Sequence, residues 1–420
     1  MFALIDCNNF YASCEKLFRP DLKHSPVVVL SNNDGCIVAR SKEAKALGFK
    51  MGEPYFQAKE KIERHGVEVF SSNYELYAEV SKRVMETLES MVPAIEIYSI
   101  DEAFADLSGI ASLVDLTELG QQIKARVQQY TGISVGVGIA PTKTLAKLAN
   151  HAAKTYRKTG GVVVLTDPVR QQKLMQLTEV GEVWGVGRRL SKQLNEMGIE
   201  SVWDFVQFDT GTIRKKFTVV LERTQRELKG QPCFGLEEAP VLKQQIVCSR
   251  SFGQRVTELN DLIEAVNHYT SRACTKLRQA DGIAQRLTVF CRTSPFSDKE
   301  PFYSNQASFS LTYPSANTKA FLPIATQLIS QIYKPNYRYA KAGIMLSDIV
   351  ASGSYQRDLF VPETDTPKDE ALMSLLDQLN KNHKGKLFFA SEGINRTWAM
   401  KRGKQSPRYL TRWQDIPKVS

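Results

Sequence analysis

The first 167 residues alternate between short apolar runs and apolar stripes of helical spacing, a pattern that predicts a mixed α+β unit. A short apolar run opens the chain and predicts a buried strand that ends at Asp6. Further strands are predicted at 94–100, 103–107, 133–139 and 162–165, and an amphipathic helix at 111–130.

Two more helices are expected in this part of the chain. The first runs up to Pro93, and its apolar residues share one face, which predicts a core-facing helix. Ser72-x-x-Glu75 has the spacing of a capping box at its start. The second begins at Pro141 and Thr142 and is strongly basic. Its positive residues are Lys143, Lys147, Lys154, Arg157 and Lys158.

Residues 26–72 have the pattern of a small subdomain inserted between these elements. The expected elements are strands at 27–30 and 36–40, a hairpin turn at 32–35, a helix at 41–47 stopped by Gly48, and a second helix from Pro54.

The second half of the chain changes character twice. Residues 168–236 are expected to form a small helical region, and residues 237–242 are expected to be a linker. The strands and helices expected after it lie at 245–252, 261–279, 284–293, 303–313, 317–333 and 339–350. This β-α-β-β-α-β order predicts an antiparallel sheet with helices on one face. A tail from 353 to 420 follows, with a helix at 371–380.

Composition narrows the class of protein. At 420 residues the chain is expected to hold several domains. Lys plus Arg is 55 and Asp plus Glu is 45, and the resulting net charge of +10 suits a polyanionic partner. The seven cysteines form no Cys-x-x-Cys pair, which favours reduced cytoplasmic thiols over disulfides or a zinc site. No signal peptide or membrane span is expected.

The candidate chemistry lies in Tyr98-Ser-Ile-Asp-Glu-Ala-Phe104. Neighbouring side chains on one strand point to opposite faces, so Asp101 and Glu102 can converge only at a hairpin tip. Adjacent strands of one sheet would bring Asp6 to them. Close carboxylates need a cation or a proton between them, and all-oxygen ligands suit Mg²⁺. Two such ions can clamp the attacking and leaving oxygens of a phosphoryl transfer. The alternative for Asp101-Glu102 is a solvated polar turn.

Four motifs carry a resemblance to a known family. Asp6-x-x-x-Phe-Tyr-Ala12 and Ser99-Ile-Asp-Glu-Ala103 resemble the Y-family, the translesion DNA polymerases. Ser31-Asn-Asn-Asp-Gly-Cys36 and Phe70-Ser-Ser-Asn-Tyr-Glu-Leu-Tyr77 are similar to its UmuC type, the catalytic subunits of bacterial DNA polymerase V. The similarity runs from residue 1 into the tail.

The resemblance implies a multidomain α+β fold, a right-hand polymerase. Its expected parts are a ferredoxin-like palm at 1–25 and 73–167, small fingers at 26–72, a helical thumb at 168–236, a linker at 237–242, a little finger at 243–352 and the tail at 353–420.

The same resemblance assigns the catalytic residues. Asp6, Asp101 and Glu102 would hold two Mg²⁺ ions, with the backbone carbonyl of Cys7 as an extra ligand. Phe10 and Tyr11 would contact the nucleotide, with Tyr11 as the steric gate that blocks a 2′-hydroxyl.

Phosphate contacts are less specific in the sequence. Lys45 and Lys154 would contact the triphosphate, although a surface position is the alternative for Lys154. Lys42 falls at a second phosphate-binding place of the family, but a solvated lysine explains it as well.

DNA contacts are expected in two regions. Gly185, Gly187 and Arg188 form a glycine turn between helices, which resembles the helix-hairpin-helix of the thumb and can present bare N–H groups to phosphate. A plain interhelical turn is the alternative. Alternation in the later strands places positive side chains on the open face of the sheet, where they suit backbone contacts to duplex DNA. They are Arg250, Arg255, Arg286, Arg292 and Lys341.

The tail is expected to bind partners. Gln356, Leu359 and Phe360 follow the pattern of the peptide that docks bacterial proteins on the sliding clamp. The segment 398–413 interleaves aromatic and basic residues and could bind nucleic acid or a partner. Resemblance favours a UmuD′-type accessory dimer and the RecA filament.

The implied function is error-prone, template-directed extension of a primer 3′-hydroxyl with deoxynucleoside triphosphates. It would act on damaged DNA in the SOS response, in the bacterial cytoplasm and at the nucleoid when bound to DNA. No proofreading nuclease domain is expected before Asp6 or after the tail. The competing hypotheses are a catalytically inactive DNA-binding scaffold and another palm enzyme such as a nucleotidyl cyclase.

Overall fold

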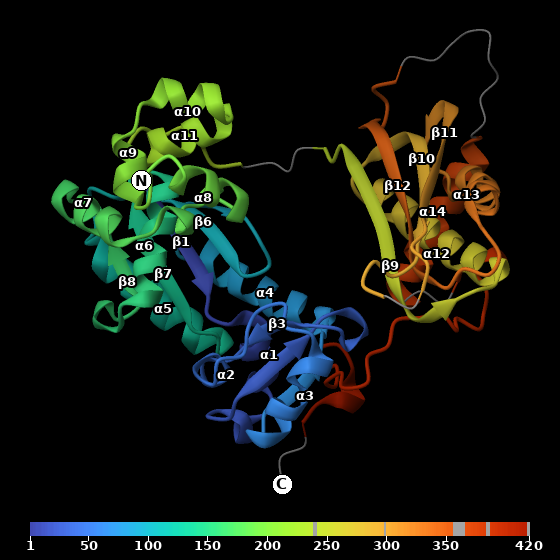
Figure 1. Ribbon diagram of the computed structural model, residues 1–420, viewed down its shortest axis with the longest axis horizontal. Coiled ribbons are helices and arrows are strands. Elements are labelled where there is room, and N and C mark those ends of the chain that lie inside the picture. The colour runs from blue at the N-terminus through green and yellow to red at the C-terminus, as the bar shows by residue number, and fades with distance from the viewer. Residues whose placement is uncertain (238–241, 298–299, 356–365, 384–386, 418–420) are drawn as a thin grey trace. The chain divides into compact units, whose positions relative to one another are not determined.

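The computed structural model describes residues 1–237, 242–297, 300–355, 366–383 and 387–417 (Figure 1). They separate into two compact units. The first unit contains the described residues between 1 and 31, 35 and 239, and 404 and 420. The second contains residues 32–34 and those between 240 and 403.

The first unit is built around a five-stranded sheet in the order β5-β6-β1-β7-β8. Its strands are β1 (Phe2–Cys7), β5 (Ala94–Ile97), β6 (Glu102–Asp106), β7 (Val135–Ala140) and β8 (Val162–Val164). β1 is fully buried and pairs antiparallel with β6 and β7 on either side. The hairpin expected between residues 94 and 107 is confirmed, because β5 and β6 pair antiparallel. Its turn lies at 98–101, and Glu102, expected at the tip, is the first residue of β6.

Helices cover both faces of this sheet. Ala3, Ile5 and Cys7 share one core with α4 (Tyr74–Glu89) and α5 (Leu116–Thr131), whereas Phe2 and Leu4 share the other with α6 (Lys143–Thr155). The alternation of β1 between two cores explains why its whole length is apolar up to Asp6. α1 (Phe10–Leu17) follows β1 directly.

A three-stranded sheet in the order β3-β2-β4 forms the inserted subdomain. It contains β2 (Val27–Leu30), β3 (Ile37–Arg40), β4 (Glu68–Ser71), α2 (Lys42–Ala46) and α3 (Tyr55–Arg64). β4, which pairs parallel with β2, was not predicted from the sequence. The capping box was wrong by one residue. Asn73 caps α4, while the Ser72 hydroxyl donates to the Leu30 carbonyl.

Five short helices complete the first unit. They are α7 (Pro168–Leu177), α8 (Arg188–Asn195), α9 (Val202–Gln207), α10 (Thr210–Lys216) and α11 (Val219–Leu228). They share the core that contains α6. The buried Glu227 carboxylate fixes α11 to the start of α6, since it accepts from Thr144 N and Oγ and from Cys233 N and Phe234 N.

The second unit has the expected β-α-β-β-α-β order. Its strands, β9 (Gln245–Val256), β10 (Gly282–Arg292), β11 (Ser304–Ser315) and β12 (Tyr339–Ala351), form an antiparallel sheet in the order β11-β10-β12-β9. α12 (Leu259–Gln279) and α13 (Thr318–Ile332) lie along one face (Figure 1). α14 (Pro367–His383) joins them through an ion pair of Asp377 with Arg278, 2.6 Å long.

The tail is divided between the units. Trp398 is buried in the second unit against Tyr269 and His268. Residues from 404 onward lie in the first unit, where Tyr409 stacks on Phe18. Among the described helices, none is long and apolar enough to cross a bilayer.

Candidate active site

Three acids meet where β1 and β6 run side by side. Asp6 lies directly opposite Glu102 in the strand register. Asp101 precedes β6 at the hairpin tip, and its backbone carbonyl accepts from Cys7 N at 2.8 Å. Ser99 orders the tip, because its hydroxyl donates to Asp101 Oδ1 at 2.7 Å and accepts from the backbone N–H of Asp101 and Glu102. The expected convergence of residue 6 with the 101–102 tip is therefore observed.

Two lysines of α6 reach these acids. Lys154 Nζ lies 2.5 Å from Asp6 Oδ2, and Lys147 Nζ lies 2.9 Å from Glu102 Oε2. Asn150, between them on the same helix, donates to the backbone carbonyls of Leu4 and Gly136. These two hydrogen bonds tie α6 to β1 and β7. They fix the position of α6 over the sheet, from which both lysines reach the carboxylates.

The two facing carboxyls titrate differently. Burial raises the pKa of Asp6 to about 7, against the opposing charge of Lys154, and a hydrogen bond shared with Glu102 adds to the rise. Burial also favours protonated Glu102, but hydrogen bonds from Asp6 and Lys147, with the charges of Lys147 and Lys154, lower the pKa of Glu102 overall. Such a split is typical of two acids that share a proton.

The donor set suits a hard cation. It consists of carboxylate oxygens with a backbone carbonyl nearby, the ligand type that Mg²⁺ prefers. The raised pKa of Asp6 indicates that the buried pair needs positive charge beyond what Lys154 supplies. As they stand, no three acidic, histidine or cysteine side chains in the described residues are grouped tightly enough to hold a metal ion. Asp101, for example, is turned toward Ser99.

Tyr11 lies in a cage of aromatic rings. Its ring stacks on Tyr77 with centroids 4.4 Å apart and meets Tyr74 edge-on at 6.0 Å. Partial burial, followed by Tyr74 and Asp101, raises the pKa of its hydroxyl. Phe10 is buried in the core, and its ring is 3% exposed. Phe10 is therefore part of the core, whereas Tyr11 is only partly buried.

Lys45 belongs to the same neighbourhood as the acids. Desolvation comes first among the causes that lower the pKa of Lys45, followed by the charges of Arg40 and Lys154, while Asp6 opposes them. Lys42 is exposed on the same helix. Arg40, which donates to the Phe49 carbonyl, was not singled out from the sequence. The signal available in the sequence was its position as the last residue of a strand, just before Lys42 and Lys45 of α2.

Lys147 is also held by three aromatic rings that sequence reasoning did not connect. Its Nζ lies 4.5 Å from the centroid of Tyr98, 5.9 Å from Phe104 and 5.3 Å from Trp184. Trp184 donates to the Tyr98 hydroxyl at 3.1 Å. Trp184 belongs to the glycine turn before α8, so this cluster joins that turn to the hairpin of the acids.

The glycine turn is open to its surroundings. Gly185 has φ of +87°, and a Cβ at either Gly185 or Gly187 would meet no described atom within 4 Å. Gly187 is the N-cap of α8, and Arg188 and Arg189 follow it with exposed side chains. Val186 N donates to the Val183 carbonyl at 2.9 Å, so only the other backbone N–H groups of this turn could meet a phosphate.

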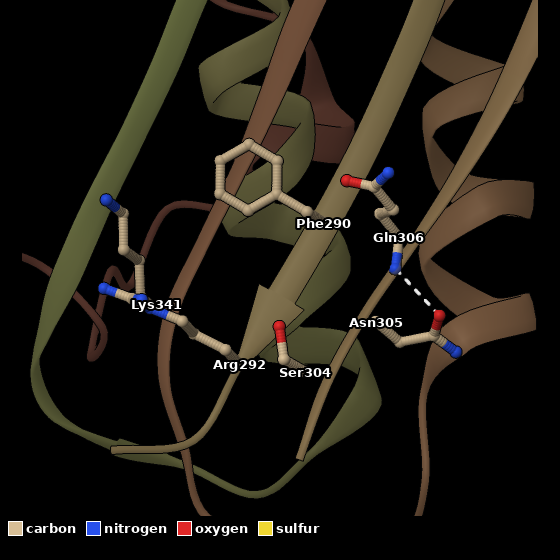
Figure 2. Close-up of a pocket in the computed structure, with 6 residues that line it drawn as sticks. All are labelled: Phe290, Arg292, Ser304, Asn305, Gln306 and Lys341. Carbon is tan, nitrogen blue, oxygen red and sulfur yellow. Dashed lines mark hydrogen bonds between the residues drawn. The ribbon is translucent and has the colours of Figure 1, made fainter. Parts of the chain in front are cut away.

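The open face of the second unit brings together Arg292 and Lys341, which lie opposite each other in the strand register. The expectation that Arg250 lines this face is wrong, because Arg250 lies opposite the buried Ala342 and its side chain belongs to the face that packs on α12. Burial, then Arg292 and Arg250, lowers the pKa of Lys341. Figure 2 shows Arg292 and Lys341 beside Phe290 at a hollow of about 450 Å³, which Ser304, Asn305 and Gln306 complete.

The other two cations are engaged with acids. Arg255 pairs with Glu300 at 3.3 Å, and Arg286 pairs with Asp348 at 3.2 Å. The clamp peptide at Gln356, Leu359 and Phe360 lies outside the described residues.

Comparison with known families covers both units. Residues 5–151 match the impB/mucB/samB family, and residues 243–359 match the C-terminal domain of that family. Residues 370–419 match a domain of unknown function.

Individual relatives match along the whole chain. Protein UmuC of Salmonella typhimurium (strain LT2) is 52% identical over 421 residues, which covers 100% of both chains. Protein ImpB of Salmonella typhimurium is 50% identical over 99% of both. DNA polymerase IV of Pelotomaculum thermopropionicum is 27% identical over 85% of this chain and 87% of its own.

Solved structures agree on the fold. A Y-family DNA polymerase chimera gives a TM-score of 0.67 at 21% identity and covers 84% of this chain and 100% of its own. An insertion ternary complex of Dbh DNA polymerase gives 0.55 with the same coverage. The fold class expected from the sequence, a right-hand polymerase with palm, fingers, thumb and little finger, is confirmed. The chain belongs to the impB/mucB/samB family and is of the UmuC type within the Y-family DNA polymerases.

Proposed function

We propose that the chain is a DNA-directed DNA polymerase that extends a primer 3′-hydroxyl across damaged template positions. The observation that carries this proposal is that Asp6 and Glu102 lie opposite each other on adjacent strands, with Asp101 directly before Glu102 at the turn. Full-length similarity to UmuC and similarity to DNA polymerase IV support the same activity.

Asp6, Asp101 and Glu102, with the Cys7 carbonyl, would hold the magnesium ions. When bound, two ions of this kind stabilise charge on the attacking and leaving oxygens of the transfer. The residues of the chain do the rest. Ser99 holds Asp101 in place through its hydroxyl. The ammonium groups of Lys154, which pairs with Asp6, and of Lys45 suit a triphosphate.

Tyr11 is proposed as the sugar-selecting residue. It is partly buried on α1, and the Tyr74 and Tyr77 rings pack against its ring. A ring supported in this way cannot easily move aside for a 2′-hydroxyl. The glycine turn with Arg188, and the neighbouring Arg292 and Lys341, would bind the DNA backbone without reading sequence.

The biological setting follows from the family. We propose action in the SOS response, without proofreading, in the bacterial cytoplasm. A sliding clamp, a UmuD′-type dimer and the RecA filament are the proposed partners. The tail offers them less free aromatic surface than its composition suggests, because Trp398 and Tyr409 pack within the chain while Trp413 is 87% exposed.

The test is insertion of a single nucleotide opposite an abasic site and opposite a normal base, with magnesium and partner proteins present. Loss of a residue that only supports a metal ligand lowers activity about 10–100-fold. Asp101→Asn removes a proposed ligand itself and should lower insertion by more than that. Asp106→Asn, at the far end of β6, should leave insertion unchanged. Insertion that survives Asp101→Asn would disprove the site. DNA binding without insertion by the wild type would favour an inactive scaffold.

A further inference from the structure

The tail adds an edge to the small sheet of the first unit. We call residues 404–410 the strap. Ser71, the last residue of β4, forms a parallel bridge with Gln405. The Ser71 N–H donates to the Lys404 carbonyl at 2.9 Å, and the Ser71 hydroxyl accepts from Lys404 N at 2.9 Å. The strap therefore begins as a short strand beside β4.

The next contact of the strap is with the cap of α4. Asn73 is fully buried, and its Oδ1 accepts from Leu76 N at the start of the helix. Its Nδ2 donates to three acceptors of the strap, Ser406 O at 3.2 Å, Ser406 Oγ at 2.9 Å and Pro407 O at 3.3 Å. One side chain thus holds the first turn of α4 and the strap at once.

Two further contacts anchor the distal part of the strap. The Tyr409 ring stacks on Phe18 with centroids 4.6 Å apart and an interplanar angle of 18°. Arg408 lies 3.1 Å from Glu75, which is in the first turn of α4. The strap therefore contacts the residue after α1 as well as the start of α4.

These are the two helices that hold the sugar-selecting ring. Tyr11 is on α1, and the rings that support it, Tyr74 and Tyr77, are in the first turn of α4, directly after Asn73. The Tyr77 hydroxyl donates to Glu15 Oε1 of α1 at 2.5 Å. A shift of the first turn of α4 would therefore move both supports of Tyr11 together.

We propose that the strap is a positioning element for sugar selection. By fixing Asn73 and the two helix ends, it keeps Tyr74 and Tyr77 pressed against Tyr11, so that a ribose 2′-hydroxyl is rejected. The inference rests on the proposed role of Tyr11. It gives residues near the C-terminus a part in the choice of nucleotide, although none of them touches it.

The measurement is the ratio of kcat/KM for a deoxynucleotide to kcat/KM for its ribonucleotide, in single insertion by the full chain with its partner proteins. Asn73→Asp keeps a good helix cap but removes the donor to the strap. Tyr409→Ala removes the ring stack, and Ser406→Ala removes one acceptor of Asn73 together with the hydrogen bond to Glu15. Trp413→Ala, exposed in the same tail, is the control.

Asn73→Asp should lower the ratio about five-fold, the equivalent of one hydrogen bond, through faster ribonucleotide insertion. Tyr409→Ala and Ser406→Ala should lower it in the same direction, and Trp413→Ala should leave it unchanged. Tyr11→Ala should lower it further. Added to Tyr11→Ala, the strap variants should change the ratio by less than about two-fold.

Because the ratio compares two nucleotides on one protein, a general loss of folding or partner binding cancels from it. Equal losses for both nucleotides in the strap variants would overturn the inference and leave the strap a structural support. If Asn73→Asp does not fold, Ser406→Ala and Tyr409→Ala decide the matter. If Tyr11→Ala itself leaves the ratio unchanged, the steric-gate proposal fails first, and the role of the strap fails with it.

Discussion

Buried acids set the electrostatics of the first unit at the scale of single residues. Asp6 and Glu15 both lie inside it, and burial raises the pKa of each to about 7. Asp6 faces Lys154, whereas hydrogen bonds from Tyr77 and Ser406 oppose the rise for Glu15. An acid stabilised mainly by hydroxyl donors remains expensive to ionise, because a hydroxyl carries no full charge.

Glu15 therefore predicts a dependence of stability on pH. Its folded pKa is raised, so the folded state binds a proton that the unfolded state has lost above about pH 4.5. The contribution to stability is complete below that pH and is lost as the pH rises through about 7. For a shift of this size it amounts to about 3 kcal/mol.

The measurement is thermal or urea unfolding of Glu15→Gln and wild type between pH 5 and pH 8. Glutamine still accepts from the Tyr77 hydroxyl but carries no ionisable proton. The variant should gain stability relative to wild type as the pH rises. A difference that stays constant across this range would show that Glu15 keeps an ordinary pKa.

Much of the candidate site could be predicted at this scale, and what was missed has a common cause. Asp6, Asp101 and Glu102 follow from short strands that end at acids, a local pattern. The partners of these acids, Lys147 and Ser99, were not assigned, and Lys154 was left open between two roles. Their roles depend on where α6 lies over the sheet and on the shape of the turn between β5 and β6. No local sequence pattern encodes either feature.

At the scale of elements, one close contact between a helix and a strand determines where α6 lies over the sheet. α6 packs on β7 at Gly138, where a Cβ would collide with the backbone of Asn150 and Ala146. A glycine is required there by contact, since its φ is not in the left-handed region. The packing places Asn150 against the Leu4 carbonyl and presents Lys147 and Lys154 to the acids.

Gly138→Ala should therefore affect stability and activity together. The methyl group pushes on backbone, which cannot rotate away, and overpacking of this kind costs about 1–3 kcal/mol or more. Nucleotide insertion should fall as well, because both lysines move with α6. Gly136→Ala on the same strand is the matched control, since its Cβ would come no closer than 3.5 Å to side-chain atoms of Asn150 and Lys154. Equal effects of the two changes on unfolding and insertion would contradict this account.

The elements that the sequence missed are those defined by distant partners. β4 is four residues long and is a strand because it pairs with β2. Asn73 rather than Ser72 caps α4, because Ser72 is drawn to Leu30 of the neighbouring strand. The long strands and helices of the second unit were predicted correctly, since each carries its own periodic pattern over ten residues or more.

At the scale of the whole molecule, the net charge of +10 matters through the cations that are free to meet phosphate. Arg255 and Arg286 are paired with acids. Arg292 and Lys341 adjoin each other, and no carboxylate of the described residues lies within ion-pair distance of either. Burial, then Arg292 and Arg250, lower the pKa of Lys341. A bound anion would offset the repulsion among these cations, which favours phosphate binding at this site.

The salt dependence of DNA binding should separate these two groups. Each phosphate contact adds about 0.9 to the slope of log K against log salt concentration. Arg292→Gln and Lys341→Gln should each reduce that slope by about one and weaken binding to all sequences alike. Arg286→Gln should change it less, because Asp348 already neutralises Arg286 and would be released as a new negative charge. Binding of primer-template DNA by the full chain, measured from about 50 to 200 mM salt, gives the slopes. Equal slopes for all three variants would mean that the ion pair opens on DNA, and that the register of the sheet does not select which cations make the contact.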